Sequence, residues 1–245
     1  MILEPETNRL MINKLYNARD MGGMPTLSGR KTAYKRFVRS DSPSGLDRES
    51  VDALIAYPVR TVIDLRSTSE IERSGNPFIG RPEIVFRNIP LIAFDPDDAG
   101  DPTMKYLIRK NLGHLYVLML EHSRDAVLDV FRAILDAPQG TVVFHCLHGK
   151  DRTGLIAALL FLLAGVSEND IVENYAASFE NIRPLVDPLI ERMPESMHHM
   201  YRSDAENMRF LLEYIRNTYD GKAEPYLRQL GLSAAEIDRL RDRMF

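Results

Sequence analysis

The chain's single cysteine, Cys146, is followed six positions later by Arg152, within the segment His-Cys-Leu-His-Gly-Lys-Asp-Arg-Thr-Gly of residues 145–154. A deprotonated cysteine can attack phosphorus, and the planar guanidinium of an arginine can bind two phosphoryl oxygens at once. The arginine binds them more tightly as charge spreads over them in the transition state. This spacing therefore predicts a phosphate-transfer site in which Cys146 is the nucleophile and Arg152 binds the phosphate.

A strand is expected just before this segment and a helix just after it. Residues 141–144 are β-branched or aromatic and follow a Pro-Gln-Gly turn, which indicates a buried strand. From Thr153 the chain is apolar on every side up to Gly165, which favours a buried helix that ends at the glycine. The unpaired N–H groups at the start of a helix bind phosphate and favour a thiolate. Cys146 is therefore expected to be nucleophilic at neutral pH.

Other residues of the segment suit the same chemistry. Thr153 is expected to place a hydroxyl near the sulfur, where a hydrogen bond would stabilise the thiolate as it leaves the phosphocysteine. Gly149 lets the backbone approach a ligand closely, and Lys150 and His148 add positive charge. The residues expected to bind phosphate or substrate in this loop are Leu147, His148, Gly149, Lys150 and Thr153, with His145 in a supporting role.

Two other interpretations of the segment are weaker. An isolated pair of cysteine and arginine would more often be structural, but here strand, loop and apolar helix occur in the order that catalysis needs. A Walker phosphate loop is disfavoured because Phe144 stands where its first glycine should be, and because Asp151 follows Lys150 in place of Ser or Thr.

The loop resembles the His-Cys-x-x-Gly-Lys-x-Arg-[Ser/Thr]-Gly signature of the cysteine-dependent protein tyrosine and dual-specificity phosphatases. Further segments resemble the successive blocks of the bacterial group typified by mycobacterial PtpB, whose loop also reads Gly-Lys-Asp-Arg. The resemblance implies hydrolysis of phosphotyrosine through a phosphocysteine, with no metal or other cofactor. The segments are residues 17–23, 38–41, 63–67 with Glu70, 226–233 and 237–240.

The general acid that protonates the leaving oxygen is the hardest residue to assign. Asp151 is our first choice, because the resembled group, and inositol-lipid phosphatases with Asp before the arginine, carry the carboxyl in the loop itself. The neighbouring cations Lys150 and Arg152 favour the ionised carboxylate, which is the wrong form for an acid unless bound phosphate offsets them. The four aspartates of residues 95–101 therefore remain alternatives, on a loop that could close as a lid.

Asp64 and Arg66 follow another expected strand, at residues 59–65. The resemblance places an Asp-Leu-Arg segment at the rim of the pocket, which implies that both residues contact the substrate. The alternative for them is a salt bridge between loops at the strand ends.

The pattern of the whole chain predicts an α/β fold with a central, mostly parallel sheet flanked by helices and a helical C-terminal third. We expect one phosphatase domain over residues 1–245, with a lid-like region at about 93–120 and a helical insertion at about 180–203. Strands are expected at 36–39, 59–65, 84–90 and 141–144, and helices at 47–57, 123–137, 167–177, 204–219 and from a capping box at 233–236.

Composition limits the partners. A net charge of −4 and a pI near 5.9 give no overall electrostatic reason to expect nucleic acid or an anionic membrane. The longest apolar run, 155–166, is too short to span a bilayer, and one cysteine cannot form an internal disulfide. The N-terminus lacks the basic and apolar regions of a signal peptide, so a cytoplasmic location is the default. Secretion without a signal stays open, since the resembled group includes exported proteins. The sequence indicates no oligomeric state.

No metal site is expected. In the acidic residues 95–101, Ala99 and Tyr106 stand where a calcium-binding EF-hand loop would need an oxygen ligand and its last glutamate. The pair His198-His199 has no spacing to cysteine or carboxylate that would support a metal.

The expected function is hydrolysis of phosphotyrosine in proteins, with phosphoserine and phosphothreonine as further candidate substrates. A phosphoinositide phosphatase using the same site is the alternative, because extra cations in the loop would suit polyphosphorylated head groups. A binding module for phosphorylated partners, a sulfurtransferase or an arsenate reductase is less favoured, since nucleophile and arginine are both intact and no second cysteine is present.

Overall fold

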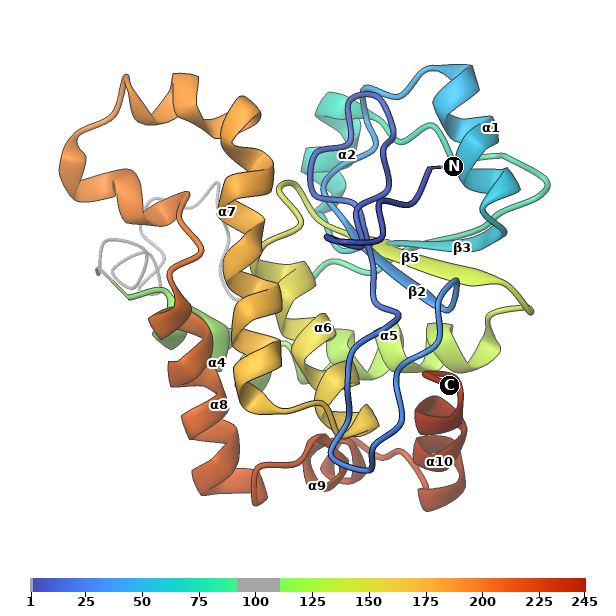
Figure 1. Ribbon diagram of the computed structural model, residues 1–245, viewed down its shortest axis with the longest axis vertical. Helices are drawn as coiled ribbons and strands as arrows, with labels where there is room; N and C mark the ends of the chain where they lie inside the picture. Colours follow the sequence, from blue (N-terminus) through green and yellow to red (C-terminus); the bar gives the residue numbers. More distant parts are fainter. Residues whose placement is uncertain (1, 92–110) are drawn as a thin grey trace.

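A five-stranded sheet in the order β1-β2-β5-β3-β4 runs through the centre of the computed structural model, which describes residues 2–91 and 111–245 (Figure 1). Only the pair β1 and β2 is antiparallel. The sequence's prediction of a mostly parallel sheet flanked by helices is confirmed, and the four strands it predicts are present within two residues of their expected ends. The strands are β1 (Arg19–Asp20), β2 (Phe37–Ser40), β3 (Val59–Asp64), β4 (Val85–Asn88) and β5 (Thr141–His145).

The register of the sheet brings the ends of its parallel strands into one row. The last residues of the four parallel strands lie beside one another across the sheet, in the order Ser40, His145, Asp64 and Asn88. The loops that follow these strands therefore leave from the same edge, where open α/β sheets bind ligands. Cys146 is the first residue past this edge.

Side chains of the central strands alternate between two cores, because successive residues of a strand point to opposite faces. Val38, Val62 and Val143 pack into one cluster with α1 (Arg48–Ala56). Their neighbours Phe37, Ile63, Val142 and Phe144 pack into a larger cluster on the other face, formed mainly by helices. Figure 1 shows α1 and α2 (Thr68–Ser74) on the first face, and α5 (Arg124–Asp136) and α6 (Asp151–Ala164) on the second.

The helix α6 is the centre of the larger core. Of its 14 residues, all but three are buried, and it ends at Gly165 in a left-handed conformation with φ of 78°. A helix of this length spans about 21 Å, short of a bilayer's hydrocarbon core of about 30 Å. Within residues 2–91 and 111–245, no helix has the length and apolarity needed to cross a membrane.

The C-terminal third is helical, as the sequence predicts. The capping box expected at Ser233 is present, with the Ser233 hydroxyl accepting from the backbone N–H of Glu236. The helices of this part are α7 (Glu168–Ile190), the 3-10 helix η1 (Glu195–Met200), α8 (Ala205–Tyr219), α9 (Ala223–Gln229) and α10 (Ala234–Asp242).

Helix α7 is longer than the helix ending at Ala177 that the sequence predicts. It starts at the expected cap, Ser167, but continues through Pro184 and Pro188 to Ile190. Each internal proline removes one helix hydrogen bond. The helix persists because apolar residues such as Val186 remain fully buried beyond Ala177.

The lid-like region expected at about 93–120 contains part of a core helix. Helix α4 (Gly113–His122) begins within it and buries Leu115, Tyr116 and Leu120. The remaining part of this region, including the aspartates of 95–101, lies outside the described residues.

Truncation of the α6 core is expected to destabilise the fold strongly. Phe161→Ala removes a ring that is 1% exposed and should lower the free energy of unfolding by about 3–5 kcal/mol. Leu27→Ala is the control, because Leu27 is 84% exposed and its loss should change that free energy by less than about 0.5 kcal/mol. Urea denaturation measures both. Similar losses in the two variants would contradict this description of the core.

Candidate active site

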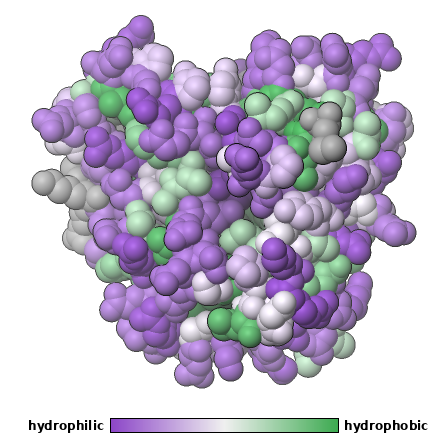
Figure 2. Space-filling model, viewed as in Figure 1, coloured by the Kyte–Doolittle hydropathy of each residue, from purple (hydrophilic) through white to green (hydrophobic). Residues whose placement is uncertain are grey.

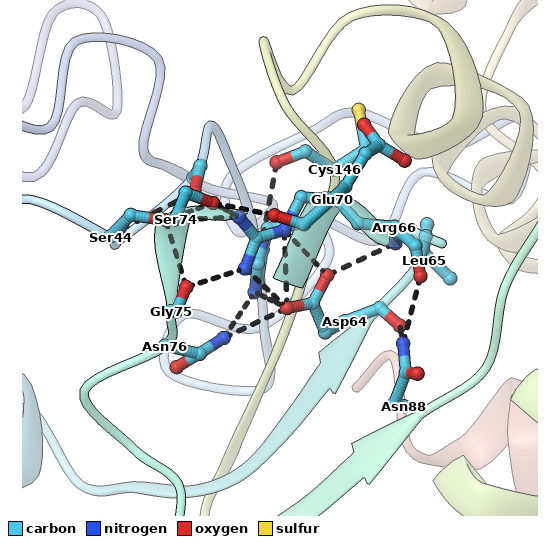
Figure 3. Close-up of polar contacts among 12 residues, drawn as sticks. Ser44, Asp64, Leu65, Arg66, Glu70, Ser74, Gly75, Asn76, Asn88 and Cys146 are labelled. Carbon is cyan, nitrogen blue, oxygen red and sulfur yellow. Dashed lines mark hydrogen bonds and ion pairs between the residues drawn. The ribbon is translucent and has the colours of Figure 1, made fainter. Parts of the chain in front are cut away.

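The loop between β5 and α6 carries the predicted nucleophile. Cys146 directly follows β5 and is 3% exposed, and α6 begins only five residues later at Asp151. Figure 3 shows the sulfur of Cys146 pointing away from the polar cluster around Arg66, which lies beneath it. The sulfur is therefore placed beside a loop that leads into the N-terminus of a buried helix, as the sequence predicts.

The carbonyl groups of this loop are turned outward, each toward a hydrogen-bond donor. The carbonyl of Leu147 accepts from the backbone N–H of Ser42 at 3.0 Å. The side-chain amide of Asn17 donates to the carbonyl of His148 at 3.0 Å and to that of Gly149 at 3.1 Å. Because the peptide bonds are trans, the N–H groups of the same peptide planes point the opposite way. The loop thus presents donors inward, which is the arrangement that holds an anion.

Gly149 is required by this path of the backbone. Its φ is +66°, in the left-handed region, and a Cβ there would lie 2.5 Å from the backbone carbonyl carbon of Ser40. Any other residue would be strained and would also collide with the end of β2. The glycine thus lets the loop pack against β2, and the expected close approach of its backbone to a ligand stays a prediction.

A buried carboxylate supports the loop from behind. Asp41 is 1% exposed and accepts hydrogen bonds from the backbone N–H groups of Tyr16 and Asn17, each at 3.0 Å. Burial raises the pKa of Asp41 to about 6. Asp41 thereby fixes Asn17, the residue that turns two loop carbonyls outward.

A buried arginine also holds the loop. Arg39 of β2 is 1% exposed and donates to the carbonyl of Gly149 at 2.9 Å and to the side chain of Asn174 at 2.7 Å. Burial lowers the pKa of Arg39 to about 10, opposed by the negative charge available at Cys146. Arg39 therefore keeps its charge at neutral pH and places positive charge near Cys146.

Arg152 is held in a fixed orientation by Glu70. Its two terminal nitrogens donate to the two carboxylate oxygens of Glu70 at 2.6 and 2.8 Å. Burial favours a raised pKa for Glu70, but the hydrogen bonds and charge of Arg152 hold it below its ordinary value. Glu70 also accepts from the backbone N–H of Ser67 at the start of α2. The sequence did not predict this partner for Arg152, although the Ser-x-x-Glu spacing of the capping box is a visible signal for the cap.

The predicted general acid, Asp151, lies in the first turn of α6 with its side chain 28% exposed. The hydroxyl of Tyr116 donates to its Oδ1 at 2.5 Å, and the Nζ atom of Lys150 lies 3.2 Å from the same oxygen. The carboxyl is thus part of the loop and fixed on one side, with part of its surface open to solvent.

The extra positive charge expected at His148 is absent at neutral pH. Burial, together with the charge of Lys150, lowers the pKa of His148 to about 4. Lys150 is fully buried, and its ammonium donates to the carbonyls of Met200 and Arg202 at 2.8 and 2.9 Å. This lysine therefore connects the loop to the last residue of η1 and to the segment that follows it.

Asp64 and Arg66 form a buried salt bridge, the alternative that the sequence left open. Both side chains are fully buried, and Nη2 of Arg66 lies 2.7 Å from Oδ2 of Asp64 (Figure 3). Arg66 also donates to the hydroxyls of Ser44 and Ser74 and to the carbonyl of Gly75. The direct contact with substrate that was expected of this pair does not agree with this burial.

His145 contributes from beneath the nucleophile. Its Nδ1 atom lies 3.1 Å from the carbonyl oxygen of Cys146, and its Nε2 atom lies 3.1 Å from the side-chain amide of Asn76. Burial lowers the pKa of His145 to about 4, although Asp64 opposes this. A neutral imidazole with Nδ1 as its donor accounts for both contacts, since Asn76 then donates to Nε2. His145 is thus well placed for the supporting role expected of it.

Thr153 and Leu147 differ in exposure. The hydroxyl of Thr153 is buried and has no hydrogen-bond partner among the described residues. This leaves it available for the predicted contact with the sulfur, which stays a prediction. The side chain of Leu147 is 44% exposed at the surface of the loop.

The aspartates of 95–101, the alternatives for the general acid, lie outside the described residues, and the pair His198-His199 lies in η1. Within residues 2–91 and 111–245, no three His, Cys, Asp or Glu side chains are grouped as metal ligands. His198 instead hydrogen-bonds to the carbonyl of Met193 at 3.1 Å.

Figure 2 shows a notch at the top of the molecule, with mostly hydrophilic walls. In the same view, Figure 1 places α7 and the segment after it on one side of this notch, and α1 and α2 on the other. The loop from β5 to α6 lies between these two sides.

The chain is similar in sequence to known proteins over most of its length. A sequence model described as "Tyrosine phosphatase family" matches residues 10–245. A protein of Nostoc commune named tyrosine-protein phosphatase is 33% identical over 242 residues, which cover 91% of this chain and 81% of that protein. The Mycobacterium tuberculosis protein named triple specificity protein phosphatase PtpB is 26% identical over 84% of this chain and 89% of its own length.

Substitution of Gly149 should separate conformational strain from collision. Gly165→Ala also places alanine at positive φ but meets nothing within 4 Å, so it should cost about 1 kcal/mol of unfolding free energy. Gly149→Ala should cost more and should also weaken binding of inorganic phosphate, because the loop must move away from Ser40. Calorimetry measures both quantities. Equal effects of the two substitutions would contradict the close packing of the loop on β2.

Because the pKa of Asp41 is raised, its contribution to stability should fall as the pH rises. The folded state keeps the Asp41 carboxyl protonated up to a pH of about 6, whereas the ordinary pKa of an aspartate is 3.8. The contribution should therefore be complete below pH 3.8 and should be lost as the pH rises through about 6.

The measurement is the difference in unfolding free energy between wild type and Asp41→Asn, from urea denaturation at several pH values. Asparagine cannot titrate, and other groups cancel in the difference. The wild type should lose stability relative to the variant between pH 4 and 6. A difference that rises with pH, or stays constant, would contradict a pKa of Asp41 that burial raises more than its hydrogen bonds lower it.

Proposed function

Because the chain belongs to the tyrosine phosphatase family, we propose that it removes phosphate from phosphotyrosine-bearing proteins through a phosphocysteine intermediate on Cys146. The chain is an enzyme, a phosphomonoester hydrolase of the protein-tyrosine phosphatase class. The observation that carries the assignment of the site is the loop after β5, whose carbonyls are held outward so that its N–H groups face inward.

In the first step, the Cys146 thiolate attacks phosphorus. A sulfur–phosphorus bond forms and the bond from phosphorus to the tyrosine oxygen breaks. Arg152 and the loop N–H groups bind the three non-bridging oxygens, whose charge increases toward the transition state. Glu70 supports this role, because it fixes the guanidinium before substrate arrives and no reorientation is needed during the reaction.

Asp151 supplies a proton to the leaving tyrosine oxygen, and so is ionised when the phosphocysteine forms. It then takes a proton from the water that attacks phosphorus, which breaks the sulfur–phosphorus bond and releases inorganic phosphate. The partial exposure of its side chain supports access by both tyrosine and water. The Thr153 hydroxyl donates to the sulfur as the thiolate is regenerated.

Phosphotyrosine is the substrate that we propose, with phosphoserine and phosphothreonine proteins as further candidates. The relative from Mycobacterium tuberculosis carries the description "triple specificity". Phosphoinositide head groups would need extra cations in the loop. His148 is neutral, and the ammonium of Lys150 donates to two backbone carbonyls, so these two residues give such head groups little support. A phosphoinositide panel therefore belongs in the test as the alternative.

We propose a cytoplasmic location. The support is chemical: the nucleophile is the chain's single cysteine, and a reducing compartment keeps such a thiol active. Secretion without a signal is the alternative, and cell fractionation distinguishes the two.

The proposed function predicts a defined pattern of losses. Phosphate release from a phosphotyrosine peptide should continue in EDTA, should disappear in Cys146→Ser, and should fall about 10²–10⁴-fold in Asp151→Ala, the usual range for loss of a general acid. Arg152→Lys should reduce kcat strongly, since a lysine cannot reproduce the two-pronged geometry.

The same assay is run on a phosphoserine peptide and on phosphoinositides. Higher kcat/KM on a phosphoinositide than on the phosphotyrosine peptide would replace the proposed substrate. Activity that survives in Cys146→Ser would contradict the mechanism. Absence of turnover with retained phosphopeptide binding would indicate a binding module.

A further inference from the structure

A chain of buried hydrogen bonds leads from the backbone of Leu112, just before α4, to the carboxyl of Asp151. The backbone N–H of Leu112 donates to Oδ1 of Asn207 at 2.9 Å, and Nδ2 of Asn207 lies 3.3 Å from the hydroxyl of Tyr175. The hydroxyls of Tyr175 and Tyr116 are 2.5 Å apart, and Tyr116 donates to Oδ1 of Asp151 at 2.5 Å. Four helices, α8, α7, α4 and α6, each contribute one side chain.

The backbone fixes the direction of this chain. A backbone N–H can only donate, so Oδ1 of Asn207 must accept and its NH2 group must face Tyr175. The Tyr175 hydroxyl therefore accepts from Asn207. Because Tyr116 donates its only proton to Asp151, the hydrogen bond between the two tyrosines is donated by Tyr175. Every hydrogen bond in the chain is donated toward the carboxyl.

The residues of this hydrogen-bond chain are closed off from solvent. Tyr116, Tyr175 and Asn207 are at most 2% exposed. Burial raises the pKa of both tyrosines far above neutral pH, so both remain protonated donors throughout the reaction. Buried polar groups of this kind are costly unless all are satisfied, and each hydroxyl here has a donor and an acceptor.

The chain also determines which carboxyl oxygen can carry a proton. Tyr116 and the ammonium of Lys150 both approach Oδ1 of Asp151. Tyr116 donates to Oδ1, and the ammonium of Lys150 carries only donors and could not accept a proton held there. The transferable proton of Asp151 is therefore assigned to Oδ2.

We propose that Tyr116, oriented by Tyr175 and Asn207, is a positioning residue that fixes the general acid of this enzyme, so that Oδ2 of Asp151 faces the leaving group. This inference rests on the proposed function, because it requires Asp151 to be the general acid. Without the Tyr116 hydroxyl, the carboxyl can rotate, and the proton is less often delivered to the leaving oxygen.

The test compares substrates that do and do not need a proton on the leaving group. We would measure kcat/KM, which reports the steps up to formation of the phosphocysteine, on phosphotyrosine and on an aryl phosphate with a much more acidic phenol. Tyr116→Phe should reduce kcat/KM about 10-fold on phosphotyrosine and less than about 2-fold on the activated substrate. Competitive inhibition by inorganic phosphate should be unchanged, since the phosphate site is intact.

Tyr226→Phe is the matched control. Tyr226 is also fully buried, and its hydroxyl also donates a hydrogen bond, to the carbonyl of Leu120 in α4 at 2.6 Å. Loss of the Tyr226 hydroxyl should change kcat/KM by the same factor on both substrates. Tyr175→Phe serves as a second variant should Tyr116→Phe not fold. It removes the donor to Tyr116 and should give a smaller loss with the same dependence on the leaving group.

Combination with Asp151→Ala separates the two proposals. With Asp151 removed, Tyr116→Phe should cause no further loss on phosphotyrosine, because a positioning residue acts only through the group it positions. Equal losses on both substrates, or a loss that persists in the Asp151→Ala background, would overturn the positioning role while leaving the phosphatase function intact. Full activity of Asp151→Ala itself would remove the general acid from the proposed function and the positioning role with it.

Discussion

The loop after β5 can hold an anion only if its carbonyl oxygens face away from the site, and this constraint determines much of the surrounding structure. Each outward carbonyl needs a donor in a region with little water. These donors come from β2 (Arg39), from the segment after it (Ser42) and from the segment before β1 (Asn17). The parallel register of β2 with β5 puts those residues beside the loop, and the left-handed turn at Gly149 permits the close approach.

The buried charged groups that support this loop lower the stability of the fold. Arg39 and Asp41 are almost completely buried, and burial lowers the pKa of Arg39 and raises that of Asp41, which in each case favours the neutral form. Apolar residues of similar volume would often be at least as stable at such positions. A fixed hydrogen-bonding geometry, and positive charge near Cys146, are what these groups contribute in return. The ion pair of Arg152 with Glu70 follows the same logic, since it orders the phosphate-binding side chain before substrate arrives.

The sequence predicts those parts of the site whose residues are close together in the chain. Strand, nucleophile, arginine and buried helix lie within 25 consecutive residues, and their order alone predicts the loop. The partners of these residues come from far along the chain, and no local pattern pairs Glu70 with Arg152 or Tyr116 with Asp151. Charge was also misjudged: the sequence shows a histidine at 148, but its neutral state depends on burial, which only the fold determines. The fold is easier to predict than these partners, because apolar strands and capped helices are encoded by residues that are close together in the sequence.

The central claim is that the chemistry passes through a covalent phosphate on Cys146. The most direct measurement is to quench turnover of a ³²P-labelled phosphotyrosine peptide in acid, digest the protein and locate the label by mass spectrometry. This mechanism predicts a phosphocysteine on the peptide that contains Cys146, formed and consumed at rates compatible with turnover. Label on a histidine or any other residue, or turnover with no covalent phosphate at any time, would contradict it.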